Sequence, residues 1–466
     1  MTKLPYIVFA LFVFIFIAAL LFDQPPRLPT TPDTVQITYW EKWTGFEGEA
    51  MKATVDFFNR KKFRNKNGQV IQCRYLATTQ VNRKSLMAIA GGHPPDVAGF
   101  WARETHIFAD MNALMDLNQF IDNDQEFDKT KYLDSFWRYC VYKRVADKEA
   151  KIWCLPTTPA TVALHWNKEM FKEAGLEPER PPQTLEELEE FAAKLTRRDK
   201  DGRLVRMGFL PPEPGWWNWA WGYYFGGKLN DGLEKITADD PKNIAAWKWL
   251  LKFNGRDQRE AEELIAFKQA FGSFDSPQNA FLSGKVGMVL QGVWMANFIR
   301  FHNPHLKWGC APFPTSFDNG GEPVTVADMD VITIPRGCRH PEEAWQLLKF
   351  INSNEGMEYL CGREENNNGG QGKLTPFKDV DAKWLAQHRH PYLQVFIDLA
   401  KSKNAVTIPQ LPVWEEYQKE LSSAFERVWL RKATPEEALG YVQRRMQPKL
   451  ERALQQLRAS EAEARR

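Results

Sequence analysis

Two stretches of this chain alternate strand-like and helix-like patterns, and this alternation constrains the fold more than any other feature. The first stretch lies within residues 35–100, and the second begins at residue 161. A strand–helix–strand unit returns the chain to the same edge of a sheet, so its strands run parallel and its helices cover the faces. The pattern therefore predicts an α/β protein with two mainly parallel sheets, each flanked by helices.

Local patterns place the expected elements along the chain. Alternating β-branched and aromatic residues predict strands at 35–40, 69–76, 96–100, 161–166, 205–210, 285–290 and 324–335. Apolar residues at helical spacing predict helices at 46–60, 81–90, 184–196, 241–253, 277–282 and from 341 onward. Thr184 with Glu187, and Thr434 with Glu437, form capping boxes that begin two helices.

The first 33 residues form a separate unit. Residues 4–22 are a run of 19 residues that is apolar except for Pro5. Nineteen helical residues span about 28 Å, close to the hydrocarbon thickness of a bilayer. Residues 1–22 are therefore either an uncleaved membrane anchor or a cleaved signal peptide, and the poor cleavage site after Ala18-Ala19 favours the anchor. Residues 23–33 are predicted to be a Pro-rich tether, and the rest of the chain should be exported.

Export would place the six cysteines in an oxidising compartment. The segments on either side of Asp147 are predicted to form a hairpin, and a turn centred there puts Cys140 opposite Cys154. A cross-strand disulfide between these two residues is one expectation, and a pair of buried free thiols is the other.

Composition and motifs exclude several classes of function. The chain has 61 Lys and Arg against 59 Asp and Glu, so it lacks the basic surplus of a nucleic-acid binder. It has no phosphate-binding loop, no H-E-x-x-H and no G-x-S-x-G motif. The pairs His302/His305 and His388/His390 have spacings that suit metals poorly and are predicted to be surface residues. We therefore expect no metal and no cofactor, and a binding protein rather than an enzyme.

Tryptophans and carboxylates follow the ends of several predicted strands. Ligands of open sheets bind beyond the carboxyl ends of parallel strands, so these side chains should gather at one edge. The 18 tryptophans could stack on the C–H faces of a sugar while carboxylates accept hydrogen bonds from its hydroxyls, although a single such ring can equally be a packing residue. The candidate ligand-binding residues are Trp40, Trp43, Trp101, Glu104, Glu213, Trp216, Trp294 and Trp414.

Six segments together carry a family resemblance. They are ITYWEKWTG at 37–45, GGHPPDVAGFWA at 91–102, LPTTPATVALHWNKEMFKEAGL at 155–176, PPQTLEELEEFAAKLT at 181–196, FLSGKVGMVLQGVW at 281–294 and DVITIPRGCRHPEEAWQLLKFI at 330–351. In order and spacing they resemble the bacterial extracellular solute-binding protein family 1, the carbohydrate-binding components of ABC importers of the maltose-binding type. The resemblance extends over most of residues 34–460.

The resemblance implies a two-lobed, periplasmic-binding-protein-like fold of type II that closes around its ligand. The N-terminal lobe would comprise residues 34–157 and 326–370, and the C-terminal lobe residues 158–325 and 371–460. Crossovers between the lobes would fall near 156–160, 324–328 and 367–375. The implied function is that of a monomer outside the cytoplasm that captures a sugar or oligosaccharide and delivers it to the permease subunits of an ABC importer.

The resemblance also assigns roles to several candidate residues. Trp101 falls on the family's stacking tryptophan, Trp294 falls on the tryptophan after its G-x-W motif, and Trp414 lies beside a further aromatic position.

The resemblance also assigns roles to two carboxylates, and the chain departs from the family pattern at two positions. Glu104 and Glu213 fall on ligand-binding carboxylates of the family. Ala160 stands where maltose binders have a glutamate, and Thr105 stands where an arginine follows the first carboxylate. These two departures put the identity of the sugar in doubt.

Two other functions remain open from the sequence. Glu41, Glu104 and Glu213 could include the acid and base of a membrane-anchored carbohydrate-active enzyme. A sugar-sensing lobe of a signalling system would share the same fold, because a fold by itself does not decide a function.

Overall fold

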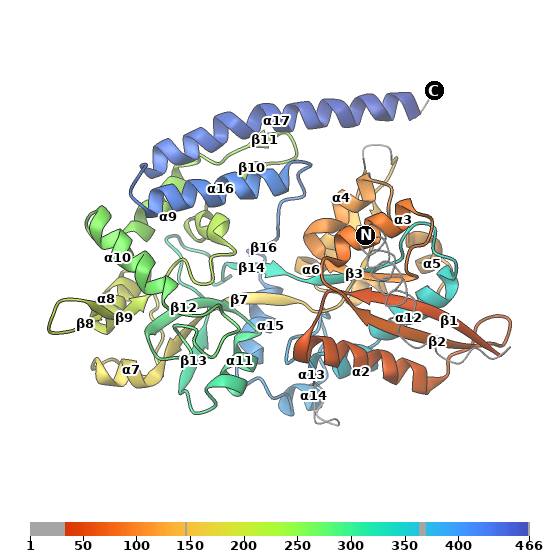
Figure 1. The fold of residues 1–466 in the computed structure, drawn as a ribbon, viewed down its shortest axis with the longest axis horizontal. Helices are drawn as coiled ribbons and strands as arrows, with labels where there is room; N and C mark the ends of the chain where they lie inside the picture. The colour runs from red at the N-terminus through yellow and green to blue at the C-terminus, as the bar shows by residue number, and fades with distance from the viewer. Residues whose placement is uncertain (1–32, 145–146, 363–369, 465–466) are drawn as a thin grey trace, which may run out of the picture.

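The computed structural model describes residues 33–144, 147–362 and 370–464, which form two lobes, each built around one β-sheet (Figure 1). The predicted two-lobed α/β architecture is confirmed. The expected anchor, residues 1–22, and nearly all of the expected tether lie outside the described residues. No described helix combines the length and the apolarity needed to cross a bilayer.

The first lobe is built on a five-stranded sheet with the strand order β2-β1-β3-β15-β6. β1 pairs in parallel with both β2 and β3, as the sequence pattern predicts. One face of β1 is buried beneath helices, and Ile37 and Tyr39 are fully buried there. The strands are β1 (Thr34–Glu41), β2 (Val70–Ala77), β3 (Val97–Trp101), β15 (Asp330–Thr333) and β6 (Leu155–Pro156).

Helices surround this first sheet (Figure 1). Their apolar faces bury residues such as Met51, Val55 and Phe58 of α2. The helical segments are α2 (Gly45–Lys61), α3 (Val81–Ala90), η1 (Ala102–Glu104), α4 (Thr105–Asp110), α5 (Asn118–Ile121), η2 (Lys129–Lys131), α6 (Asp134–Cys140), α12 (Pro341–Ile351), α13 (Asn354–Gly362) and α14 (Ala382–Ala386). A small hairpin of β4 (Val141–Tyr142) and β5 (Lys151–Ile152) follows α6.

The second lobe is built on a seven-stranded sheet with the order β16-β14-β7-β12-β9-β8, and β13 pairs with β7 beside this path. Its central strand β7 is buried along its whole length, as expected of a strand covered on both faces. The strands are β7 (Ala160–Asn167), β8 (Arg197–Arg198), β9 (Leu204–Phe209), β12 (Val286–Gly292), β13 (Trp308–Ala311), β14 (Thr325–Asp328) and β16 (Ala405–Val406).

Helices also cover the second sheet, and the long helices α16 and α17 lie side by side at the top of the view in Figure 1. The capping boxes form as predicted: the Thr184 hydroxyl accepts a hydrogen bond from the Glu187 amide, and the Thr434 hydroxyl accepts one from the Glu437 amide. The helical segments are α7 (Lys168–Glu173), α8 (Leu185–Leu195), η3 (Asn218–Phe225), α9 (Pro241–Leu250), η4 (Leu251–Phe253), α10 (Gln258–Gln269), α11 (Met295–His302), α15 (Leu393–Lys401), α16 (Trp414–Trp429) and α17 (Pro435–Ala464). β10 (Asn230–Asp231) pairs with β11 (Lys235–Ile236).

Both sheets are mixed rather than mainly parallel. In the first sheet β15 runs antiparallel to β3 and to β6, and in the second sheet β7 runs antiparallel to β12, β13 and β14. Two of these strands, β7 and β15, directly follow a passage of the chain from the other lobe. A strand that enters from the other lobe arrives at the opposite end of the sheet from a strand that follows a local crossover helix.

The single strand expected at 324–335 is two strands in two different sheets. β14 belongs to the second sheet and β15 to the first, with Met329 between them. The Met329 carbonyl accepts a hydrogen bond from the Ala102 amide of the first lobe at 3.1 Å. A continuous run of β-forming residues therefore includes a passage between the lobes. The local sequence pattern does not indicate it, because the pattern carries no information about which sheet a strand joins.

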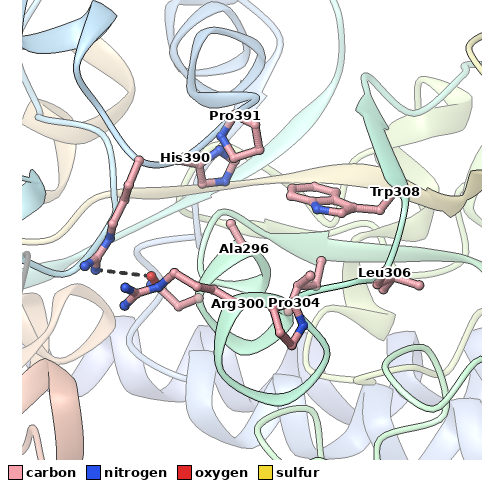
Figure 2. A pocket seen from close by; sticks show the side chains of 10 residues that line it. Ala296, Arg300, Pro304, Leu306, Trp308, His390 and Pro391 are labelled. Carbon is pink, nitrogen blue, oxygen red and sulfur yellow. Dashed lines mark hydrogen bonds between the residues drawn. The ribbon is translucent and has the colours of Figure 1, made fainter.

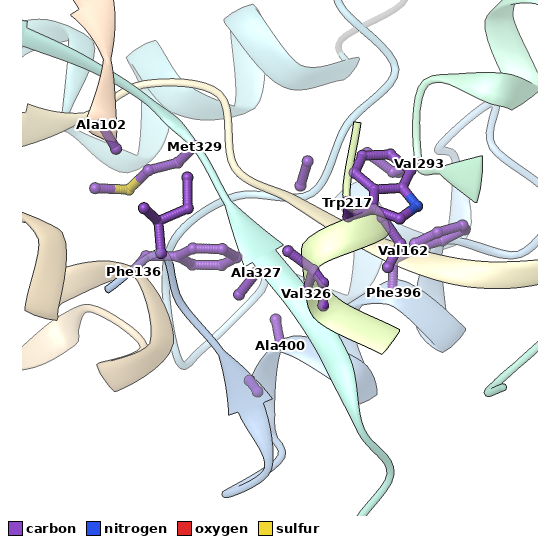
Figure 3. Close-up of a cluster of buried hydrophobic side chains, with 14 of the residues drawn as sticks. Ala102, Phe136, Val162, Trp217, Val293, Val326, Ala327, Met329, Phe396 and Ala400 are labelled. Atoms are coloured by element: carbon purple, nitrogen blue, oxygen red, sulfur yellow. The ribbon is translucent and has the colours of Figure 1, made fainter. Parts of the chain in front are cut away.

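Helix α6 of the first lobe also forms hydrogen bonds with the second lobe. The Tyr139 hydroxyl donates to the Ala327 carbonyl of β14 and accepts from the Ile408 amide, both at 2.8 Å. The Ser135 hydroxyl donates to the Ala400 carbonyl of α15 at 2.7 Å. Figure 3 shows the buried apolar cluster at this junction, where Phe136, Ala327 and Ala400 lie together.

Two further local predictions are wrong. Residues 277–282 form turns instead of a helix, because the Asn279 side chain accepts hydrogen bonds from the amides of Phe281 and Leu282 and so competes with helical bonding. The pair His388/His390 is not at the surface, whereas His302 and His305 are exposed as expected.

His390 is 4% exposed and contacts the Val293 carbonyl through Nε2 at 3.1 Å. Burial lowers its pKa to about 3.

The expected disulfide is also absent. Val141 lies opposite Ile152 in the β4–β5 pair, so the residue opposite Cys140 is Trp153, and the Cys140 and Cys154 thiols contact each other without a bond between them. Both cysteines are buried free thiols, which is the alternative that the sequence left open.

Candidate ligand-binding cleft

A cavity of about 690 Å³ lies between the two lobes and receives side chains from both. This volume falls within the range of about 300–1,000 Å³ that is usual for small-molecule sites. Its walls include the ends of β1 and β3 from the first lobe, the passage between β14 and β15, and the segments around η3, α11 and α16 from the second lobe.

The structure brings four of the eight candidate residues to this cavity. Trp43 and Trp101 line it from the first lobe, and Trp216 and Trp294 line it from the second. Trp216 is the most open of the four, with 47% of its surface exposed. The other four candidates, Trp40, Glu104, Glu213 and Trp414, are not among the residues that line the cavity.

The two carboxylates that lie away from the cavity are buried in local polar contacts. Glu104 is 4% exposed and accepts a hydrogen bond from the side-chain amide of Asn82 at 2.7 Å. Glu213 is 7% exposed and accepts a hydrogen bond from the side-chain amide of Asn279 at 2.9 Å. Burial raises the pKa of both carboxyls above the usual value, against the effect of these hydrogen bonds.

The two tryptophans that lie away from the cavity pack against other groups. Trp414 is 1% exposed and meets the Trp219 ring edge-on at 5.2 Å between centroids. Trp219 itself lines the cavity, so Trp414 supports the aromatic wall from behind. Trp40, in β1, is half-buried against the core of the first lobe.

The second-lobe wall of the cavity is a continuous group of aromatic rings. Trp216 contacts Trp217, Phe274 and Trp294 at centroid distances of 5.8, 4.4 and 5.9 Å. Trp294 lies back over Gly292, where an added Cβ would approach the indole ring to 2.4 Å. Glycine at position 292 therefore allows this ring to lie close against the end of β12.

Sequence reasoning left four aromatic residues of the cavity wall outside its set of candidates. They are Trp217, Trp219, Phe274 and Phe298. Trp217 and Trp219 belong to the run that follows β9, where the sequence alone does not decide which rings face the cavity. Phe274 and Phe298 come from a loop and from α11, and no strand-end signal marks them.

The first-lobe wall is charged. The Lys42 ammonium lies 4.6 Å from the centre of the Trp43 ring and 5.4 Å from that of Trp101. The Lys373 ammonium lies 4.6 Å from Trp43, and the Arg103 guanidinium lies 4.7 Å from Trp101. Both first-lobe rings therefore already carry cation–π contacts.

A buried ion network supports this wall. Lys42, whose side chain is 5% exposed, contacts Glu41 at 3.2 Å and Asp330 at 2.9 Å. Burial alone would lower the pKa of Lys42, but the two carboxylates outweigh it and raise the pKa. The Thr158 hydroxyl donates to the other Asp330 oxygen at 2.6 Å. A Cβ at Gly99 would lie 2.0 Å from the Glu41 carboxylate, so glycine there makes room for the network.

Asp328 is the titratable group of the cavity whose pKa is displaced toward neutrality. Burial, and then the neighbouring Asp330 carboxylate, raise its pKa to about 6, while Arg103 and Lys42 act in the opposite direction. One carboxylate oxygen accepts the Met329 amide at 2.8 Å. Asp328 lines the cavity at the passage between lobes, where a hydroxylated ligand would meet both lobes.

The lobes also touch across the cleft. Phe46 of α2 lies 6.0 Å from Phe298 and 5.2 Å from Phe301 of α11, measured between ring centroids. Beside this contact, Lys373 pairs with the Glu47 carboxylate at 2.9 Å, and both line the cavity. This pair lies within the first lobe, because residues 376–378 are still hydrogen-bonded to residues 131–133. The described conformation therefore has α2 packed on α11.

A smaller cavity of about 170 Å³ lies within the second lobe, beside Trp308 (Figure 2). Figure 2 shows Arg300 and His390 on its walls, and the Arg389 guanidinium donates to the Asn297 side chain at 3.2 Å. This volume is below the usual range for a ligand site, and no candidate residue lines the cavity. The cleft between the lobes is therefore the better candidate.

The two positions that depart from the family pattern have different surroundings. Ala160 lines the cleft, so the missing glutamate would have faced the ligand space. Thr105 is 1% exposed, and its hydroxyl lies 3.6 Å from the Cys154 sulfur. Among the described residues, no group of three or more His, Cys, Asp or Glu side chains is arranged to hold a metal ion.

Two lobes with a ligand-sized cavity between them define the class of proteins that enclose a solute between domains. A sequence profile of the bacterial extracellular solute-binding protein family matches residues 47–358, and the chain belongs to this family. Membership places its site of action outside the cytoplasm.

Relatives and solved structures agree with this assignment. A Brucella abortus (strain 2308) protein named as a binding protein is 25% identical over 62% of this chain and 66% of its own length. The sn-glycerol-3-phosphate-binding periplasmic protein UgpB of Pectobacterium atrosepticum is 23% identical over 62% of each chain. The aligned parts thus span slightly less than two thirds of these relatives.

Among solved structures, CpMnBP1 with mannobiose bound has a TM-score of 0.69 at 24% identity. The match covers 88% of this chain and 99% of that one. At this identity the likeness establishes the fold, and the ligand is a separate question.

Proposed function

We propose that this protein captures a neutral sugar or oligosaccharide between its lobes and delivers it to the permease of an ABC importer. One observation carries the proposal: an aromatic wall on the second lobe faces a polar, charged wall on the first lobe across one cavity. Sugars present apolar C–H faces to aromatic rings and hydroxyls to hydrogen-bonding groups, so this pairing of walls fits them.

The charges of the cavity favour a neutral ligand over a phosphate. Its cations are Arg103, Lys373 and Lys419, and its carboxylates are Glu47, Asp328, Asp330 and Glu415. The carboxylates are at least as numerous as the cations, so the cavity offers an anion no electrostatic surplus. Mannobiose, the ligand named for a structural neighbour, is the better first probe, and sn-glycerol 3-phosphate, named for a sequence relative, is the contrasting one.

Calorimetric titration with a panel of neutral mono-, di- and trisaccharides, with mannobiose among them, tests this proposal. We expect at least one neutral sugar to bind and sn-glycerol 3-phosphate to bind at least tenfold more weakly. Tighter binding of the phosphate would contradict the assignment of a neutral ligand. Recovery of hydrolysed sugar after incubation would contradict a binding function and favour a carbohydrate-active enzyme.

Binding should close the two lobes. Both walls must contact the ligand at once, and the passages between lobes are short enough to act as hinges. Small-angle scattering should show a smaller radius of gyration, or a narrower distribution of conformations, at saturating sugar. An unchanged scattering profile at saturation would show that the lobes are already fixed.

Residues 1–22 are proposed to anchor the protein to the membrane, with residues 23–33 as a tether beside the permease. The length of the apolar run supports the anchor. Sequencing of the mature N-terminus after cell fractionation tests it, since a soluble product that begins near residues 20–35 would identify a cleaved signal peptide.

A further inference from the structure

A second hollow between the lobes lies next to the sugar cleft. It has a volume of about 630 Å³ and meets the cleft at Ile408, which lines both. Its second-lobe walls are formed by residues 403–410, which include β16, and by six residues that follow η3, namely Gly226, Gly227, Lys228, Asn230, Gly232 and Leu233. Arg138 of α6 contributes from the first lobe. We call this hollow the basic groove.

Unpaired positive charge distinguishes the basic groove from the sugar cleft. Arg138, Lys228 and Lys403 line it, and no Asp or Glu does. Within the described residues, none of these three side chains lies within ion-pair distance of a carboxylate, although the whole chain is nearly neutral. Arg138 uses Nε to contact the Asp134 carbonyl at 3.1 Å, and Glu322 accepts only the backbone amide of Lys403.

The rim of the basic groove is apolar and open. Leu233 is 56% exposed and Phe317 is 36% exposed, and both line the hollow. Exposed apolar and aromatic side chains beside arginine are typical of protein–protein interfaces, whereas a site for a small anion buries its cations. The three cations here are exposed, which favours a macromolecular partner over a small anion.

The wall of the groove also includes the edge of the second sheet. β16 is the edge strand of the second sheet and pairs in parallel with β14 on its inner side. The amides of residues 403, 404, 405 and 408 already donate to groups of the protein itself, so a segment that lies along this edge is bound by the side chains of the groove.

We propose that the basic groove binds an extended acidic segment of a partner protein. Charge complementarity selects the acidic residues, and the rim around Leu233 and Phe317 selects apolar residues between them. Because Arg138 belongs to the first lobe and Lys403 to the second, the bound segment contacts both lobes at once. This site is separate from the sugar cleft and does not depend on the identity of the sugar.

Fluorescence anisotropy with a labelled hexaglutamate peptide at about 50 mM salt tests the proposal, because exposed charges are only weakly screened there. We expect hexaglutamate to bind the full chain and hexaglutamine not to bind. The variant R138E/K228E/K403E should bind hexaglutamate at least tenfold more weakly. Arg138→Glu and Lys403→Glu alone should each weaken binding about threefold, since both lobes contribute a cation.

A matched variant separates the groove from general surface charge. R259E/K129E/K200E reverses one arginine and two lysines that are exposed and lie outside the groove, and it should bind hexaglutamate within twofold of wild type. The neutral variant R138Q/K228Q/K403Q repeats the groove test if charge reversal lowers the melting temperature.

Several results would overturn the proposal. One is that hexaglutamate does not bind the wild-type chain. Another is that the groove variant and the matched variant lose the same amount of affinity for hexaglutamate. Phosphatidylglycerol vesicles and a single-stranded hexathymidylate serve as further probes. If either binds more tightly than hexaglutamate and loses that binding in the groove variant, the groove takes a lipid surface or a nucleic acid instead of a protein segment.

Discussion

The two walls of the cleft between the lobes use aromatic rings in different ways. On the second lobe, Trp216, Trp294 and their neighbours contact one another, and Trp216 keeps nearly half of its surface exposed. On the first lobe, Trp43 and Trp101 lie against the cations of Lys42, Lys373 and Arg103. The rings of the second lobe are therefore open to a ligand, and those of the first lobe are partly covered by neighbouring Lys and Arg side chains.

We expect the two lobes to contribute different interactions to ligand binding. The second lobe would supply the stacking surface, and the first lobe would supply charged hydrogen-bonding groups held by the network of Lys42, Glu41 and Asp330. Substitutions in the first lobe should then act mainly on stability, and those in the second lobe mainly on affinity.

The largest effect should follow Lys42→Met. Removal of the ammonium leaves the buried Glu41 and Asp330 carboxylates without their partner, which typically costs about 3–5 kcal/mol. The free energy of unfolding from denaturant titration measures it. Lys143→Met, at an exposed lysine of the same lobe, is the control and should change stability by less than about 0.5 kcal/mol. Equal effects of the two substitutions would contradict the role of the network.

The next effect should follow Trp216→Ala. Loss of a central, open ring typically costs about 2 kcal/mol or more, which corresponds to about thirtyfold in sugar affinity. Calorimetry measures the affinity, and the melting temperature should change little because the ring is half exposed. Tyr441→Ala, at a ring that is 42% exposed outside the cleft, is the control. Trp101→Ala should cost less affinity than Trp216→Ala, and an equal or larger cost would remove the contrast between the walls.

A smaller effect should follow pH through Asp328. Its raised pKa means that the carboxyl gains a proton as pH falls through about 6, and the protonated group accepts fewer hydrogen bonds from sugar hydroxyls. Sugar affinity should therefore fall between pH 7 and 5, by about tenfold if one charged hydrogen bond is lost. The same protonation stabilises the ligand-free fold, because a raised pKa means that folding favours the protonated form.

Asp328→Asn separates this carboxyl from other titrating groups. The variant should bind sugar with an affinity that no longer falls between pH 7 and 5. An unchanged pH dependence in the variant would assign the effect to another group of the cleft.

The smallest effect should follow Phe46→Ala. Its contacts with Phe298 and Phe301 join the lobes, and aromatic pairs of this kind contribute about 0.5–1.5 kcal/mol. We expect sugar to dissociate about threefold faster, because the closed form loses one contact while the ligand keeps all of its own. Met87→Ala, on an exposed residue of the same lobe, is the control for stopped-flow measurements. An unchanged dissociation rate in Phe46→Ala would show that this contact does not stabilise the closed form.

The sequence by itself determined the elements whose signals are local. α3 occupies residues 81–90 as predicted, and Thr184 begins α8 through its own hydroxyl, because periodicity and capping involve residues within a few positions of one another. The expectation that ligands bind beyond the carboxyl ends of strands selected Trp43, Trp101, Trp216 and Trp294, which line one cavity. It succeeded for the same reason, because each ring follows a strand whose position the local pattern indicates.

Only the tertiary structure decided which side chains share a space. Glu104 and Glu213 follow strands just as the tryptophans do, yet each lies beside an asparagine from another segment and away from the cavity. Phe298 and Asp328 reach the cleft from a helix and from a passage between sheets. Such placements depend on contacts between segments that are tens to hundreds of residues apart, and a local pattern of polarity carries no information about which distant segment will lie alongside.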